Sequence, residues 1–408
     1  MGFVGRKPTN APLTSDDIPN GIIGAEDLSS GLAKLTWDTS VKTSGFTASA
    51  NTGYFCNTTS AAFTVTLPAS PTAGDSIQLV DYAGTFDTNS LLILPNGNKI
   101  EGGTGNVQLS GEREGVRLVY IDSTQGWLAT SGINEGTDAL SPLPYTVDFL
   151  VIAGGGSGGS NTAGGGGAGG YRNSYSTETS GGSGSSEESL SFTSGIVYTV
   201  TVGAGGASVN GSLKGNTGSN SSISGTGITT ITSSGGGGGG ADVGDKTGLS
   251  GGSGGGGSNA AGGSGTANQG FNGENNVNGG GGGGAGEAGG TDGSNQGGDG
   301  LASSITGSSI TRAGGGGGRG TVSSPSGGDG GGGQGAGDSG TAANGTVNTG
   351  GGGGGARANT NSGAGGSGVV ILRIPTTNYS GTTTGSPTVT TSGSDTIIVF
   401  NSSGSITG

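Results

Sequence analysis

The chain has 408 residues, 105 of them glycine, and a net charge of −13 at pH 7. Only 28% of the residues are hydrophobic and 5% aromatic, too few for one large conventional core, so we expect several small β units in series. The acidic charge argues against nucleic acid as a partner, because nucleic-acid-binding surfaces are basic. The chain has no histidine and one cysteine, Cys56, which excludes Ser-His-Asp and Cys-His catalysis, His/Cys zinc sites and an internal disulfide.

Residues 1–39 are predicted to form an irregular or short-helical lead. Asp16-Asp17 and the stretch Glu26–Leu28 can each begin a brief helix. Two interpretations are open: a disordered terminus, or a segment that attaches to a partner and becomes ordered there. Met1–Pro8 lacks the apolar core of a signal peptide, and no apolar run approaches the ~20 residues of a membrane helix. We therefore expect a soluble protein made in a cytosol.

Residues 40–132 are the most conventional part of the chain and predict a small antiparallel β domain. Phe63, Val65 and Leu67 alternate with polar residues, which is the pattern of a half-buried strand. Further strand-like stretches follow at hairpin spacing, at 77–82, 91–94, 107–109, 116–121 and 127–129. No group of polar residues here has the pattern of a site, so the expected role is a scaffold or an oligomer interface. Residues 133–144 are predicted to be a linker.

The rest of the chain is organised around a glycine block between Ala153 and Gly368. It is entered by Tyr145–Ile152 and left by Val369–Ile374, both short, apolar and rich in β-branched residues, as buried strands are. Matched strands at the two ends predict a folded insertion whose ends meet in one sheet. A hairpin is expected within 190–202, and the tail strand Thr396–Phe400 is expected to fold back beside this sheet.

The glycine block contains long runs of glycine at Gly235–Gly240, Gly279–Gly284, Gly314–Gly318 and Gly350–Gly355. Collagen is excluded, because it needs a strict Gly-X-Y period and abundant proline. A flexible linker is one remaining interpretation. The other, which we favour, is a bundle of polyglycine-II helices with about three residues per turn, whose N–H and C=O groups point sideways to neighbouring helices. Ordering so much glycine costs conformational entropy, so such a bundle needs the frame that the flanking strands supply.

Four motifs give this region a specific resemblance. They are FLVIAGGG at Phe149–Gly156, GGGGAGGY at Gly164–Tyr171, YTVTVGAGG at Tyr198–Gly206 and GVVILR at Gly368–Arg373. In this order they resemble the glycine-rich domain of phage tail-fibre proteins, and they are similar to the tail-fibre tip adhesin of some T-even phages. The resemblance implies a sandwich of polyglycine helices whose loops at one end bind the host receptor. The stretch 54–130 also resembles a β domain of phage fibres.

Other chemistry has less support from the residues. Gly-x-Gly-x-x-Gly recurs, but it indicates a nucleotide site only within a βαβ unit. A carboxylate pair such as Glu187-Glu188 can hydrolyse glycosides, yet a solvated hairpin turn explains this pair better. Ca²⁺ is an alternative at four turn aspartates that lack calcium-loop spacing, Asp292, Asp299, Asp329 and Asp338. The prediction is that the protein has no catalytic residues, no metal and no cofactor.

The loops between the glycine runs are expected to lie alternately at the strand end of the bundle, termed the base, and at the far end, termed the tip. The number of runs has the wrong parity unless Gly297–Gly300, the weakest, is left out. The base then carries 258–261, 291–313 and 338–348, and the tip carries 160–163, 241–250, 271–278, 321–326 and 356–362. Loops on a rigid scaffold are suited to binding. The predicted receptor-binding residues are Asn161, Thr162, Asp242, Lys246, Leu249, Phe271, Asn272, Glu274, Asn275, Asn276, Val322, Arg357, Asn359 and Asn361.

The sequence thus predicts a mostly β protein with a polyglycine-II bundle, comprising a virion attachment segment (1–39), a β domain (40–132), a linker (133–144), a receptor-binding domain (145–375) and a C-terminal β segment (376–408). The predicted function is that of a phage tail fibre that binds a host polysaccharide or outer-membrane protein and is not an enzyme. Expected partners are this receptor, tail or baseplate proteins at the N-terminal segment, and other copies in a homotrimer. The expected location is the virion. A structural spacer and a fibre-borne polysaccharide depolymerase are the alternatives.

Overall fold

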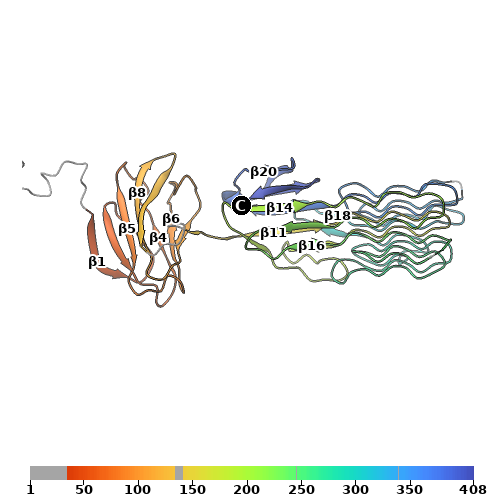
Figure 1. Cartoon of the computed structure of the whole chain (residues 1–408), viewed down its shortest axis with the longest axis horizontal. Helices are drawn as coiled ribbons and strands as arrows, with labels where there is room; N and C mark the ends of the chain where they lie inside the picture. The colour runs from red at the N-terminus through yellow and green to blue at the C-terminus, as the bar shows by residue number, and fades with distance from the viewer. Residues whose placement is uncertain (1–34, 134–140, 245, 339) are drawn as a thin grey trace, which may run out of the picture. The chain divides into compact units, whose positions relative to one another are not determined.

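The computed structural model describes residues 35–133, 141–244, 246–338 and 340–408. It divides into two compact units, residues 1–143 and 144–408, both drawn in Figure 1. Apart from one 3-10 turn, η1 (Thr376–Asn378), all regular structure in the described residues is β, so the mostly-β prediction is confirmed. Within the same residues, no helix is long and apolar enough to cross a membrane. The short helices expected near Asp16 and Glu26 lie outside the described residues.

The first unit consists of two five-stranded sheets whose buried side chains form one core. One sheet has the order β1-β3-β5-β8-β9 and the other the order β10-β7-β6-β4-β2. Alternate apolar residues of each strand point into the space between the sheets. The strands are β1 (Thr36–Lys42), β2 (Phe46–Thr47), β3 (Thr52–Cys56), β4 (Phe63–Thr66), β5 (Ser76–Asp81), β6 (Leu91–Leu94), β7 (Val107–Leu109), β8 (Gly115–Asp122), β9 (Gly126–Ile133) and β10 (Ser141–Pro142).

Strand pairing in this unit differs from the antiparallel domain that the sequence predicts. β1, β3 and β5 pair in parallel, and so do β2, β4 and β6. The reason is that consecutive strands alternate between the two sheets, so neighbours within a sheet run in the same direction. Antiparallel pairing joins β5, β8 and β9, and it also joins β6, β7 and β10. The sequence pattern locates β4 to β9 but not β1 to β3, and hairpin spacing carries no information about this crossover order.

The first unit also extends beyond the 40–132 range expected for the β domain. β1 begins at Thr36, inside the predicted lead, and the ring of Trp37 stacks on Phe55 of β3 with centroids 4.8 Å apart. At the other end, β10 pairs with β7 through Ser141 and Pro142, inside the predicted linker. Both additions place strands on the edges of existing sheets.

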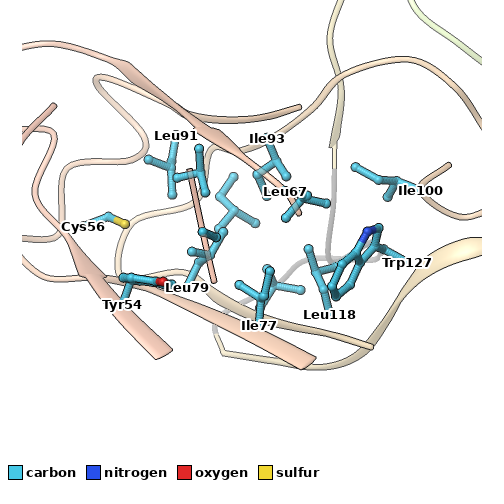
Figure 2. Packing of buried hydrophobic residues seen from close by; sticks show 14 of the residues in the cluster. Tyr54, Cys56, Leu67, Ile77, Leu79, Leu91, Ile93, Ile100, Leu118 and Trp127 are labelled. Atoms are coloured by element: carbon cyan, nitrogen blue, oxygen red, sulfur yellow. The ribbon is translucent and has the colours of Figure 1, made fainter. Parts of the chain in front are cut away.

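Figure 2 shows the packed centre of the first unit. Leu67, Ile77, Leu79 and Trp127 have no exposed surface. Burying a large apolar side chain contributes ~1.5–3 kcal/mol, so this cluster is the main source of stability for the unit. Cys56 lies in the same cluster, and its burial raises the pKa of the thiol to about 12. The thiol is therefore protonated throughout the physiological range.

The strands that flank the glycine block meet in one sheet of the second unit, as predicted. β11 (Tyr145–Ile152) pairs antiparallel with β19 (Val369–Pro375). β22 (Asp395–Phe400) pairs with the other edge of β19, so the tail folds back on this sheet as expected. The other strands of the unit are β12 (Tyr171–Asn173), β13 (Leu190–Phe192), β14 (Val197–Thr201), β15 (Ser221–Ser224), β16 (Ile231–Ser233), β17 (Leu301–Ser303), β18 (Ile310–Arg312), β20 (Thr383–Thr384), β21 (Thr388–Ser392) and β23 (Gly404–Thr407).

The sheet that contains β11 and β19 is covered on both faces. Its order is β12-β11-β19-β22-β21, with β13 also paired to β11. Phe149 and Val151 of β11 pack with Tyr198 of a second sheet, β16-β15-β14-β23-β20. Leu150 and Ile152 face the opposite way and pack with Ile305 in the loop after β17. A strand buried on both faces has a continuous apolar sequence, which explains why this part of β11 shows no alternation.

Beyond these strands lie long segments without strand or helix assignment that run side by side, here termed the glycine bundle (Figure 1). Each segment is joined to its neighbours by backbone hydrogen bonds. In one central segment, successive N–H groups donate to three neighbours in turn at 2.8–2.9 Å: Gly165 to Gly280, Gly166 to Gly353, Gly167 to Gly237, Ala168 to Gly283, Gly169 to Gly350 and Gly170 to Ser234. The direction of donation therefore repeats every third residue.

Glycine is required in this segment because neighbouring backbones occupy the space of a side chain. A Cβ atom on Gly165 would lie 2.0 Å from the carbonyl oxygen of Gly316, and one on Gly166 would lie 2.1 Å from that of Gly156. Carbon and oxygen atoms that are not bonded cannot approach so closely. The second unit thus has two kinds of interior, an apolar core between sheets and a bundle packed backbone against backbone.

Candidate functional site

The turns of the glycine bundle divide between its two ends. The base is the end at β11 and β19, and the tip is the opposite end, where the segments turn back (Figure 1). The segment after β11 runs to the tip, turns at Asn161-Thr162 and returns to β12. Both turn residues have positive φ, 75° and 50°, a conformation that asparagine tolerates better than most residues.

Contacts with this first turn place the other tip turns. The side-chain amide of Asn161 donates to Ser212 Oγ at 3.0 Å. The backbone carbonyl of Asn161 accepts the N–H of Asp242 at 3.1 Å. The carbonyl of Thr162 accepts the hydroxyl of Ser258 at 2.5 Å. Followed from one turn to the next, the described tip residues are 161–162, 210–212, 241–244, 246–247, 259–260, 276–278, 292–295, 319–324, 338, 340–341 and 357–361.

Several base assignments made from the sequence are wrong. Residues 258–261 are expected at the base, but the N–H of Asn259 donates to the carbonyl of Asn276 at the tip, at 2.8 Å. Within 291–313, Ile305 packs at the base as expected, whereas the side chain of Asn295 donates to the carbonyl of Arg319 at the tip, at 2.7 Å. Within 338–348, residues 338 and 340–341 are likewise at the tip.

The cause of these errors is that only runs of consecutive glycine were counted as crossings of the bundle. Gly297–Gly300, left out as the weakest run, is a complete segment, since Gly298 donates to Gly282 at 2.9 Å and accepts from Gly315 at 2.8 Å. Residues 213–219, with glycine only at positions 215 and 218, also form a crossing. Leaving out Gly297–Gly300 merges the tip turn 292–295 and the base strands β17 and β18 into one predicted base loop, 291–313, and leaving out 213–219 hides the tip turn 210–212.

Most of the predicted receptor-binding residues do lie together at the tip. Asp242 and Lys246 form an ion pair of 3.0 Å, next to the turn of Asn161 and Thr162. The side chain of Asn361 accepts from Asn210 of a neighbouring turn at 2.7 Å. Three more predicted side chains at or beside the tip turns are exposed to solvent: Asn275, Val322, which is 86% exposed, and Asn359.

Two of the predicted residues shape the tip from inside. The carboxylate of Glu274 accepts the N–H groups of Gly281 and Asn295, at 2.9 and 2.8 Å, and the side-chain amide of Asn276, at 2.9 Å. Asn276 in turn accepts the N–H of Asn278. Because these groups satisfy donors of the fold itself, their first role is to hold the turn in place.

Three predicted residues lie within segments, away from the turns. The N–H of Phe271 donates to Gly284 at 3.0 Å, next to the base core. Asn272 accepts the N–H of Gly265 with its side chain, and Leu249 donates its N–H to Gly238, both at 2.9 Å. The predicted tip loops 241–250 and 271–278 therefore extend too far towards the base.

A charged group at the tip was only partly predicted. Arg319 Nη2 lies 3.2 Å from Asp338 Oδ1, and Arg357 Nη1 donates to the backbone carbonyl of the same aspartate. We term these three residues the arginine group; the sequence prediction contained only Arg357. Arg319 and Asp338 each directly follow a glycine, at the point where a segment ends. Charge at that position is the signal that identifies them.

An acidic group lies at the edge of the bundle. Carboxylate oxygens of Glu287, Asp292 and Asp299 lie within 4.8 Å of one another. Burial, followed by the charges of the two aspartates, raises the pKa of Glu287, while an N–H from Asp299 lowers it. One oxygen from each carboxylate gives three ligands, fewer than the about 6–8 that Ca²⁺ takes, and Asp299 already accepts the N–H of Asp329 at 2.6 Å. Asp338 belongs to the arginine group, so the four aspartates considered for Ca²⁺ do not converge.

A polar cleft of about 570 Å³ lies near the base, lined in part by Arg172 and Glu187. The carboxylate of Glu187 accepts from Nε of Arg172 at 2.9 Å and from the hydroxyl of Ser180 at 3.0 Å. Both carboxylate oxygens of Glu187 are held by groups of the fold itself. The geometry of Glu187 is thus that of a structural ion pair.

A sequence profile for a glycine-rich domain matches residues 130–375, which include β11, the glycine bundle with its tip, and β19. The chain belongs to this glycine-rich domain family. A search of curated proteins gives no match. The glycine-rich domain therefore coincides with the part of the chain that carries the tip turns, and the tail strands β20 to β23 complete its base from outside the matched range.

Proposed function

We propose that this chain is the receptor-binding protein of a phage tail fibre and that the tip of its glycine-rich domain contacts the host cell surface. The observation that carries the proposal is the gathering of turns from 161 to 361 at the one end of the bundle that is remote from the sheets. Short turns on a rigid scaffold are where binding residues commonly lie. The order of the glycine motifs, which resembles that of phage tail-fibre proteins, supports the biological setting.

We further propose that the segments of the bundle are polyglycine-II helices. Hydrogen bonds that repeat every third residue, as in Gly164–Gly170, agree with a helix of about three residues per turn. A segment bonded to three neighbours has little freedom to move. The tip turns then lose little conformational entropy when a receptor binds, which favours affinity.

In this proposal the first unit and the residues before it connect the glycine-rich domain to tail or baseplate proteins, and three copies form a fibre in the virion. The receptor is a surface polysaccharide or an outer-membrane protein. The mechanism is binding without bond cleavage. Several weakly bound tips on one particle give high avidity, so no single tip needs to bind tightly.

Competition for adsorption tests the proposal. Host cells are incubated with the purified chain before phage are added, and the free phage are counted. The chain should block adsorption, and a variant with Gly/Ser in place of 357–361 should not. A spacer subunit would leave adsorption unchanged in both cases, and a depolymerase would release new reducing ends from host polysaccharide.

A further inference from the structure

The arginine group, Arg319, Asp338 and Arg357, joins three successive tip turns and has an excess of positive charge. Both guanidinium groups approach one aspartate, and Arg357 donates to its backbone carbonyl, not to its carboxylate. Two cations thus lie beside a single aspartate, whose carboxylate pairs with Arg319. This local excess stands out in a chain whose net charge is −13.

Other basic side chains of the second unit are matched differently. Arg172 pairs with Glu187 and Arg373 pairs with Asp395, both near the base. Lys246 pairs one to one with Asp242 at the tip. Among these ion pairs of the described residues, the arginine group is the one in which two cations lie beside a single acidic residue.

The two sides of this group differ in how firmly they are held. The side chain of Arg319 is 20% exposed, and its backbone is fixed by Ala163, which accepts its N–H at 2.9 Å, and by Asn295, which donates to its carbonyl at 2.7 Å. Its buried Nε atom has no hydrogen-bond partner. The side chain of Asp338, by contrast, is 70% exposed to solvent. An incoming anion can therefore replace Asp338 while Arg319 stays in place.

We propose that the arginine group binds an anionic group, a carboxylate or a phosphate, of a host surface polysaccharide. The proposal rests on the receptor-binding function proposed above and names the class of ligand. The anion takes the place of the Asp338 carboxylate and accepts from the guanidinium groups of Arg319 and Arg357, whose planar donors match carboxylate and phosphate oxygens. The carboxylate of Asp338 competes with the anion for the donors of Arg319, so it weakens anion binding.

Binding of the full chain to immobilised polymers tests this assignment. Polygalacturonate presents carboxylates, phosphomannan presents phosphates, and dextran is the neutral control. We expect the chain to bind at least one anionic polymer and not dextran. Arg357→Gln should weaken that binding by about tenfold or more, as loss of a charge-assisted hydrogen bond does, and Asp338→Asn should strengthen it. Comparison of binding to the two anionic polymers distinguishes a carboxylate ligand from a phosphate ligand.

Lys214→Gln is the matched control, because it removes one positive charge beside Thr247 of the tip and outside the arginine group. If Lys214→Gln and Arg357→Gln weaken binding equally, long-range charge accounts for it and the site is refuted. Equal binding to dextran, or no effect of Arg357→Gln, also overturns the assignment. Melting curves of all variants verify folding. Arg319→Lys keeps the positive charge but removes the planar set of guanidinium donors. Adsorption competition separates the two proposals: a chain with Arg357→Gln that still blocks phage refutes the anion site but leaves the receptor-binding function standing.

Discussion

The carbonyl oxygen of Gly166 lies 2.0 Å from the point that a Cβ atom on Gly282 would occupy. Gly282 also donates its N–H to Gly316 and accepts from Gly298, so its segment cannot shift away from Gly166 without losing other bonds. This relationship shows why the interior of the bundle excludes side chains: the obstacle is backbone, which cannot change rotamer.

Gly282→Val is therefore expected to prevent folding of the second unit and to leave the first unit intact. Overpacking usually costs ~1–3 kcal/mol, and here the cost should be higher because no neighbouring side chain can rearrange. Calorimetry of the full chain should lose one of two transitions. Gly227→Asn is the control, since φ is +82° there and a Cβ meets nothing within 4 Å. Normal melting of Gly282→Val would contradict the backbone packing.

Replacement of tip residues 357–361 by Gly/Ser residues of equal length should separate binding from stability. Constant loop length keeps the closure entropy unchanged, so the melting temperature should change little. Adsorption should fall sharply, because loss of central binding side chains typically costs ~2–4 kcal/mol each. The matched control is the base turn 346–349, whose Thr349 carbonyl accepts from Ala313. If that base replacement abolished adsorption and the tip replacement did not, the receptor would meet the other end.

Stability should depend on pH through Glu287, whose pKa is raised in the folded state. A carboxyl with a raised folded pKa binds its proton more tightly when folded, so its contribution to stability is present at low pH. That contribution is lost as pH rises from the unfolded value of about 4.3 through the folded one. Glu287→Gln should therefore raise the melting temperature relative to wild type at pH 7 and not at pH 4. A gain of equal size at both pH values would show that the charge is irrelevant.

Cys56 should report unfolding of the first unit alone. The thiol is fully buried and its pKa is about 12, so neither access nor ionisation permits alkylation at pH 8 while the unit is folded. Iodoacetamide should label Cys56 only in denaturant. The extent of labelling should rise over the same denaturant range in which Trp127 loses its buried environment. Gly282→Val should label as slowly as wild type. Rapid labelling of that variant would mean that the two units unfold together.

Phe400→Ala should destabilise the second unit by ~3–5 kcal/mol, as buried phenylalanine truncations do. Phe400 has no exposed surface and packs between the two sheets at the base. The tail that carries it closes the frame of the bundle, so urea denaturation should show bundle and base unfolding together. Val389→Ala on the adjacent strand β21, where the side chain is 40% exposed, should change stability little. Similar effects of both substitutions on stability would contradict the role of the tail in closing the frame.

The sequence by itself determined the frame of the second unit. Tyr145–Ile152 and Val369–Ile374 are apolar enough to require burial, and their positions on either side of the glycine block required the ends of that block to meet. Runs such as Gly279–Gly284 likewise required close backbone packing, because glycine in that number is costly to order without it. These are properties of local composition, and they can be inferred without knowing which segments pack against each other in the fold.

Only the tertiary structure decided which end of the bundle each turn occupies and which charges meet there. A peripheral segment contacts the bundle on one side, so it needs glycine only at the contacting positions. In 213–219 a Cβ on Gly215 or Gly218 would lie 2.1 Å from a neighbouring carbonyl oxygen, while Asn216 and Thr217 between them are exposed. Such a segment has no glycine run to count. The arginine group cannot be predicted from the sequence for a different reason. Arg319 and Arg357 are brought to Asp338 by the packing of separate segments and not by their spacing along the chain.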